Sequence, residues 1–136
     1  MENINRRSAL AIGLGAASVL VIGKGTLAEA AAKEKMIAEG VVERSLGEGP
    51  AIIPGYGKVM LRDIVIKPGA STPPNNAMKN AMVCHITRGQ VEVVQDGKRF
   101  IAKTNHVWTC NVGTVEQTFN KGKSDAIMRI TDLLPA

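Results

Sequence analysis

Residues 59–130 consist of short runs rich in β-branched side chains, each closed by a turn signal, and this pattern constrains the fold most. The clearest signal is Asp96-Gly97, which separates two alternating runs. Asp-Gly favours a type I′ hairpin because both central residues of that turn need a positive φ. Many short strands at close spacing indicate an all-β sandwich or barrel with antiparallel strands. We therefore expect strands at 59–66, 82–87, 90–95, 98–102, 107–110, 115–119 and 126–130.

Four residues in this region have the spacing of turn positions in a known pair of motifs. Gly69 and Gly89 match the two ends of the first motif, and Gly113 and Asn120 match the second. Through these residues the chain resembles the cupin family over about residues 56–132. The resemblance implies a jelly-roll β-barrel, which in many cupins holds a metal through three histidines and one glutamate. Glycines at the matching positions keep the turn geometry available.

The metal-ligand positions of the two motifs hold other residues. Under the resemblance, Met82 takes the glutamate position and Glu116 takes that of the third histidine. Asparagine is a poor ligand for transition metals and methionine is a soft one, so we expect no metal at these positions and no cofactor. The first two histidine positions hold Asn76 and Met78, or Asn75 and Ala77 under the other spacing that the family allows.

Six residues are expected to line the inside of the barrel. Cys84 lies two residues after Met82 and should face the same side of its strand, whereas His85 should face the other side. Glu116 is the single candidate catalytic residue, as a general base in an apolar cavity. The expected ligand pocket consists of Asn76, Met78, Met82, Cys84, Cys110 and Glu116.

The two cysteines leave three alternatives. A Cys84–Cys110 disulfide would close a loop of about 26 residues and stabilise the fold by roughly 3–4 kcal/mol. Two buried free thiols would instead pack as small apolar groups. A role for one of them in metal binding is the third alternative, and the sequence does not decide among the three.

The first 30 residues have the pattern of an export signal. Arg6-Arg7 precedes an apolar run over residues 9–22, and Ala28-Glu29-Ala30 provides a cleavage site. Paired arginines are typical of the twin-arginine pathway, whose machinery would then be a partner. We expect cleavage after Ala30 and a periplasmic protein, or a membrane-anchored one if the signal stays uncut.

The chain is expected to divide into three parts: the signal at 1–30, an arm or linker at 31–50 and the cupin-like barrel at 51–136. Residues 31–39 are compatible with two turns of helix that end at Gly40. The arm is either a tether or a segment that pairs with a second subunit. A homodimer is favoured because the edges of a jelly roll need to be covered.

The composition argues against nucleic acid as a partner. The formal net charge is only +5 and aromatic residues make up 3% of the chain, so stacking platforms for bases are scarce. The sequence favours an exported barrel that is not an enzyme and binds a small organic ligand or a larger periplasmic complex. The alternative is a metal-dependent cupin enzyme or a soft-metal, copper-type binder with Asn, Met, Cys and Glu ligands.

Overall fold

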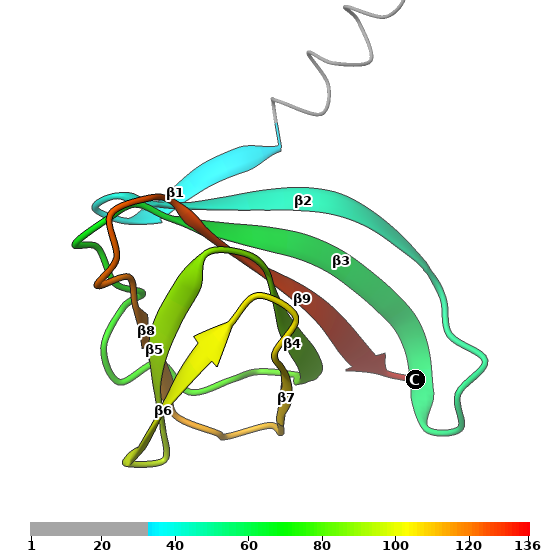
Figure 1. Cartoon of the computed structure of the whole chain (residues 1–136). Coiled ribbons are helices and arrows are strands. Elements are labelled where there is room, and N and C mark those ends of the chain that lie inside the picture. Colours follow the sequence, from blue (N-terminus) through cyan, green and yellow to red (C-terminus); the bar gives the residue numbers. More distant parts are fainter. Residues whose placement is uncertain (1–32) are drawn as a thin grey trace, which may run out of the picture. The chain divides into compact units, whose positions relative to one another are not determined.

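The computed structural model describes residues 33–136, which form nine β-strands (Figure 1). All the expected strands are present, and the all-β prediction is confirmed for the described residues. No described helix is long and apolar enough to cross a membrane. The strands are β1 (Glu34–Ala38), β2 (Val41–Pro50), β3 (Tyr56–Ile66), β4 (Ala81–Arg88), β5 (Gln90–Gln95), β6 (Lys98–Lys103), β7 (Val107–Cys110), β8 (Glu116–Phe119) and β9 (Ala126–Pro135).

The strands form two antiparallel sheets that enclose a common core, as Figure 1 shows. The larger sheet has the order β1-β2-β3-β9-β4-β7, and the smaller one has the order β6-β5-β8. The last strand, β9, lies between β3 and β4, so the end of the chain closes the middle of the larger sheet. Residues from β3, β4, β7 and β9 are thereby placed side by side.

The turns follow the chemistry that the sequence predicts. Asp96 and Gly97 have φ values of 48° and 81°, and they connect the paired residues Gln95 and Lys98, as a type I′ hairpin requires. Gly69, Gly89 and Gly113 also have positive φ. At the position where the second cupin motif carries its first glycine, this chain has Asn105 with a φ of 73°. Asparagine tolerates the left-handed region better than most residues, so the turn is retained.

The N-terminal segment differs from the expected helix. Residues Glu34–Ala38 form β1, which pairs with β2, and β2 pairs along its length with β3. A two-turn helix is marginal by itself, whereas pairing with β2 satisfies the backbone of this segment. The residues expected to form an arm or linker therefore join the larger sheet. The predicted signal at 1–30 lies outside the described residues.

Alternation along β4 and β9 determines which side chains reach the core. On β4 the side chains of Met82, Cys84 and Ile86 are buried, while Val83 and His85 lie on the opposite face with greater exposure. The same alternation on β9 buries Met128, Ile130 and Asp132. The prediction that Met82 and Cys84 share a face and His85 takes the other is confirmed.

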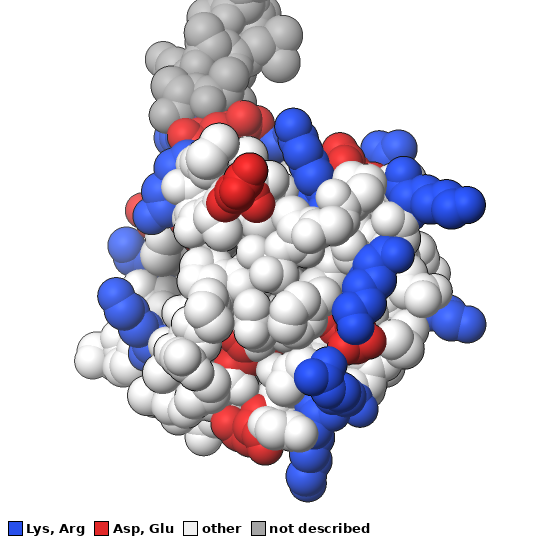
Figure 2. All heavy atoms as spheres, turned by 90° about the vertical axis from the view of Figure 1, so that its left-hand side faces the viewer, with Lys and Arg blue, Asp and Glu red and all other residues white. Residues whose placement is uncertain are grey.

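The face that lies at the left in Figure 1 shows no continuous basic stripe among the described residues. Lysine and arginine side chains lie mainly around the edge of this face, acidic side chains interrupt them, and the centre is uncharged (Figure 2).

Candidate functional site

Three buried side chains meet where β4, β7 and β8 approach one another. Cys84 comes from β4, Cys110 ends β7 and Glu116 begins β8. Cys84 is fully buried and Glu116 is only 4% exposed. One ligand atom from each, two sulfurs and a carboxylate oxygen, lie within 4.8 Å of one another. We call these three residues the thiol–carboxylate cluster.

Hydrogen bonds hold the cluster in place. The Cys110 thiol donates to Glu116 Oε2 at 3.1 Å, and Trp108 Nε1 donates to the same oxygen at 3.1 Å. Gln95 Nε2 lies 3.3 Å from Cys110 Sγ. Both bonds to the carboxylate use Oε2, and Glu116 also lines the lumen of the barrel. The carboxylate is therefore anchored by one oxygen beside a cavity.

The Cys84 thiol is held in its protonated form. The neighbouring Cys110 thiol, burial and the nearby Glu116 carboxylate raise the pKa of Cys84 above its ordinary value, and Arg62 offsets this only in part. A thiolate is the form that attacks electrophiles and binds metals. Cys84 is consequently inert as a free nucleophile, and a metal ion would have to displace its proton.

The two thiols are free and not joined in a disulfide. In the register of β4 and β7, Cys84 is opposite Trp108 and Cys110 is opposite Met82, so the cysteines are diagonal neighbours. Diagonal positions in an antiparallel pair are about 7–8 Å apart, whereas a disulfide needs Cα atoms within about 4.4–6.8 Å. A bond between them would require the backbone to move. Of the three alternatives for the cysteines, the structure argues against the disulfide and leaves packed thiols and metal binding.

Replacement of Cys84 by alanine is expected to reduce the loss of stability at alkaline pH. The ordinary pKa of the thiol is 9.0, and the folded protein holds it higher. The contribution of this raised pKa to the free energy of unfolding is therefore fully present below the unfolded pKa and declines as the pH rises, because only the unfolded chain then releases the Cys84 proton. The decline is at most about 1.4 kcal/mol per pH unit.

Urea denaturation at about pH 8 and about pH 10 measures this change, because linked protonation sets the slope of stability against pH. The native protein should lose more free energy of unfolding between the two values than Cys84→Ala. Equal losses would show that the Cys84 pKa is not raised in the folded state.

The lumen beside the cluster is small. Its volume is about 50 Å³, which accommodates an ion or a few water molecules, since a water needs at least about 10–15 Å³. Pockets for organic ligands usually measure about 300–1,000 Å³. The lumen is lined by Ile37, Arg62, Ile64, Thr72, Asn76, Met78, Met82, Glu116, Thr118, Met128 and Ile130.

An open cleft of about 430 Å³ adjoins the lumen. Both spaces share part of their lining, so a thin layer of side chains separates them. The cleft also includes Met60 and Asp132 from the middle of the larger sheet. The shared residues are Ile37, Arg62, Asn76, Met78 and Met82.

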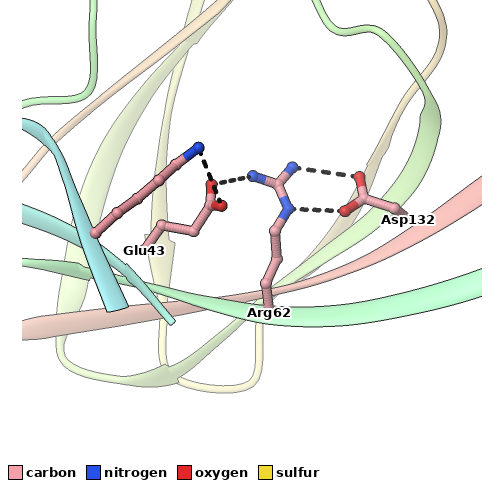
Figure 3. Close-up of polar contacts among 4 residues, drawn as sticks. Glu43, Arg62 and Asp132 are labelled. Atoms are coloured by element: carbon pink, nitrogen blue, oxygen red, sulfur yellow. Dashed lines mark hydrogen bonds and ion pairs between the residues drawn. The ribbon is translucent and has the colours of Figure 1, made fainter. Parts of the chain in front are cut away.

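An arginine clamped by two carboxylates lies in this separating layer (Figure 3). Arg62 Nε and Nη2 donate to the two oxygens of Asp132 at 2.7 and 3.2 Å, and Nη1 donates to Glu43 at 3.0 Å. Burial by itself would lower the pKa of Arg62, but these bonds raise it above its ordinary value. Lys35 pairs with Glu43 in turn. The two positive charges of this group balance its two negative charges.

The structure divides the six expected pocket residues between two adjoining sites. Asn76, Met78, Met82 and Glu116 line the lumen, whereas Cys84 and Cys110 lie in the cluster that Glu116 completes. Of the two spacings that the motif allows, the one with Asn76 and Met78 places its residues at the lumen. These side chains do not form the three-histidine, one-glutamate site of many cupins.

Sequence reasoning missed Trp108, Arg62 and Asp132. Trp108 precedes Cys110 by two residues and therefore shares its face of β7, which alternation alone indicates. Asp132 occupies a core-facing position in the alternation of β9. A carboxylate at such a position predicts a buried partner, because buried charges are normally paired. Its partner Arg62, 70 residues earlier in the chain, is not evident from local sequence.

No protein-family model and no curated protein matches this chain. Solved structures do match. The cupin domain of Cnp3 from Schizosaccharomyces pombe has 20% identity and a TM-score of 0.59, over 74% of this chain and 67% of that one. An RmlC-like cupin from Shewanella frigidimarina has 17% identity and a TM-score of 0.59, over 76% and 83%. A predicted oxalate decarboxylase from Thermotoga maritima has 17% identity and a TM-score of 0.60, over 74% and 90%.

At these identities the likeness shows the fold alone, and the described part of the chain has the cupin fold. The similar structures include a predicted decarboxylase and a sugar phosphate isomerase from Silicibacter pomeroyi as well as a domain not named as an enzyme. One fold supports many activities, so the function has to be argued from the site.

Proposed function

We propose that this chain is an exported cupin-fold protein that binds one soft metal ion through the thiol–carboxylate cluster. The observation that carries the proposal is the approach of two buried sulfurs and one buried carboxylate to within 4.8 Å. Cysteine thiolates select soft and borderline ions such as Cu(I) and Zn(II) over Mg(II) or Ca(II). The proposal adopts the soft-metal alternative that the sequence offers, with Cys84, Cys110 and Glu116 as ligands.

The dimensions of the cluster suit such an ion. A zinc–sulfur bond is about 2.3 Å, so two thiolates lie about 3.8 Å apart around a tetrahedral ion and about 4.6 Å apart across a linear one. Both separations fall within the 4.8 Å that bounds the ligand atoms. The close approach of the three ligand atoms supports a shared ion.

Binding is an exchange of protons for the ion. When each sulfur–metal bond forms, the S–H bond breaks and its proton passes to solvent, with no electron transferred. Because the pKa of Cys84 is raised, protons compete strongly with the ion at this ligand. Metal affinity should therefore decline as the pH falls.

Within the lumen, the small volume favours an ion over a small organic ligand, whereas the adjoining cleft of about 430 Å³ has the size of an organic-ligand pocket. A cavity of about 50 Å³ is well below the range of about 300–1,000 Å³ for such ligands. It also leaves little space for a substrate beside Glu116, which weakens the general-base hypothesis. A role as an accessory subunit of a larger periplasmic complex needs no lumen, and it is the function left if no metal binds.

The predicted export of the chain is relevant to the state of the two thiols. Disulfides form readily in oxidising compartments, so two thiols that stay reduced in an exported protein need a structural reason, which burial and the diagonal placement of Cys84 and Cys110 provide. Both sulfurs thereby remain available as metal ligands. The twin-arginine pattern at Arg6-Arg7 fits this, because that pathway carries proteins that are already folded.

Metal analysis of protein purified from the periplasm, without chelator or affinity-tag metal, tests the proposal. We expect about one equivalent of a single soft metal per chain, since one cluster offers one set of ligands. Loss of an outer-shell partner weakens metal binding by about 10–100-fold, and loss of a cysteine ligand should weaken it more. Cys84→Ser and Cys110→Ser should each exceed this range, whereas Glu116→Gln should weaken metal binding by about tenfold. His85→Ala, which removes an imidazole from the opposite face of β4, is the matched control and should bind normally.

Circular dichroism and urea denaturation establish that each variant is folded. Metal-free protein that takes up neither Cu(I) nor Zn(II) after reduction would overturn the proposal. Uptake that His85→Ala removes and the two cysteine variants retain would also overturn it.

A further inference from the structure

We infer that the ion is Cu(I), and that Met60, Met78 and Met82 form its route from the open cleft to the two thiols. The inference rests on the proposed function and deepens it.

The distribution of methionine is the first observation. The chain has six methionines, of which five lie in the described residues. Four of these five line the lumen or the cleft, and Met36 on β1 is the exception, 73% exposed. Met60 lines the cleft, Met128 lines the lumen, and Met78 and Met82 line both. Thioethers are therefore present from the open cleft to the wall of the lumen.

Strand register supplies the second observation. Met60 on β3 is opposite Asp132 on β9, Asp132 is opposite Met82 on β4, and Met82 is opposite Cys110 on β7. Residues directly opposite across strands share a face, with Cβ atoms about 4.5–5.5 Å apart. One row thus runs across the sheet from a half-buried thioether to a buried thiol. Met82 is the last residue before the cluster and is 4% exposed.

The chemistry of the row distinguishes among metals. Thioether sulfur is a neutral, soft ligand that suits Cu(I), whereas Zn(II) in proteins is bound by thiolate, imidazole and carboxylate. A Cu(I) ion can pass from one thioether to the next without any proton transfer. Only when the ion reaches Cys84 and Cys110 does an S–H bond break, and the thiol proton then passes to solvent.

The charges beside the row permit a cation to pass. Arg62 lies in the layer between cleft and lumen, where an unpaired guanidinium would repel it. Asp132 and Glu43 both bind this guanidinium, and Lys35 pairs with Glu43, so the group as a whole is neutral (Figure 3). The thioethers and the thiol of the row are soft ligands, and the Asp132 carboxylate between Met60 and Met82 is neutralised by Arg62.

Methionine is also a common filler of irregular cores, and that role would need no metal. Leucine substitution separates the two roles, because leucine conserves volume and costs less than about 1.5 kcal/mol but removes the sulfur. Met60→Leu, Met78→Leu and Met82→Leu test the route. Met36→Leu is the matched control, since Met36 lies outside both spaces.

The experiment follows the transfer of Cu(I) from a weak chromophoric chelator to the reduced, metal-free protein by stopped-flow absorbance. It also compares final Cu(I) and Zn(II) occupancy. The three route variants should accept Cu(I) severalfold more slowly than the native protein and Met36→Leu, with unchanged loading of Zn(II). Met82→Leu should lower the preference for Cu(I) over Zn(II) by about tenfold.

Equal Cu(I) transfer rates in the route variants and Met36→Leu would overturn the inference and leave the metal site standing. Binding of Zn(II) without Cu(I) would do the same. If the native protein binds neither ion with its thiols reduced, the proposed function fails, and this inference fails with it.

Discussion

Replacement of Asp132 by alanine should lower the free energy of unfolding by about 3 kcal/mol, because removing one member of a buried ion pair costs about 3–5 kcal/mol. The Asp132 side chain is 6% exposed and accepts two bonds from Arg62. Without it the guanidinium, 24% exposed, keeps only Glu43. This remaining partner places the expected loss at the low end of the range. Urea denaturation of the two proteins measures it.

A matched exposed pair provides the control. Glu34 and Arg44 are 2.6 Å apart, but their side chains are 40% and 44% exposed. Glu34→Ala should therefore cost less than about 1 kcal/mol. The double variant Arg62→Met/Asp132→Leu should regain much of the lost stability, because no charge is left without a partner. If Asp132→Ala costs no more than Glu34→Ala, the buried pair does not stabilise this fold.

Gly89→Ala is expected to destabilise the protein by about 2–5 kcal/mol, through backbone strain of about 1–2 and overpacking of about 1–3. Gly89 joins β4 to β5 with a φ of 78°. An added Cβ would lie 2.9 Å from the carbonyl oxygen of Asp125 and 3.1 Å from the Cα of Ala126. Both neighbours are backbone atoms where β9 begins, so the close contact is relieved only if the backbone of the sheet shifts.

Gly97→Ala isolates the strain from the clash. Gly97 has a φ of 81°, and an added Cβ there would meet nothing within 4 Å. It should therefore cost only the strain, about 1–2 kcal/mol. Thermal or urea denaturation of the two variants gives the difference. Equal destabilisation would show that the close approach at Gly89 is relieved without cost.

Much of the fold is predictable because it depends on local chemistry. The β-branched runs predict the strands β3 to β9, and Asp96-Gly97 predicts the tight hairpin. The facing of Met82, Cys84 and His85 follows from their spacing along one strand. The exceptions are β1 and β2, which fall in the predicted arm or linker. The residues around Lys35 suit a helix locally, and both segments become strands through pairing with each other and with β3. Propensity is a weak guide when tertiary pairing supplies the backbone hydrogen bonds.

The candidate site is predictable only in part. The motif positions select Asn76, Met78, Met82 and Glu116, and the structure places all four at the lumen. They do not show that Glu116 contacts Cys110, or that Cys84 lies beside both. That arrangement depends on the pairing of β4 with β7, whose partners are more than 20 residues apart in the chain.

The sequence by itself determined the strands β3 to β9, the tight turns and the alternation of inward and outward side chains along these strands, because these depend on neighbours in the chain. Only the tertiary structure decided which inward side chains meet. The cross-strand register brings Arg62 to Asp132, Cys84 to Cys110, and Met60 into one row with Met82. Register depends on the packing of the whole core, since a shift of one residue would turn every side chain of a strand to the opposite face.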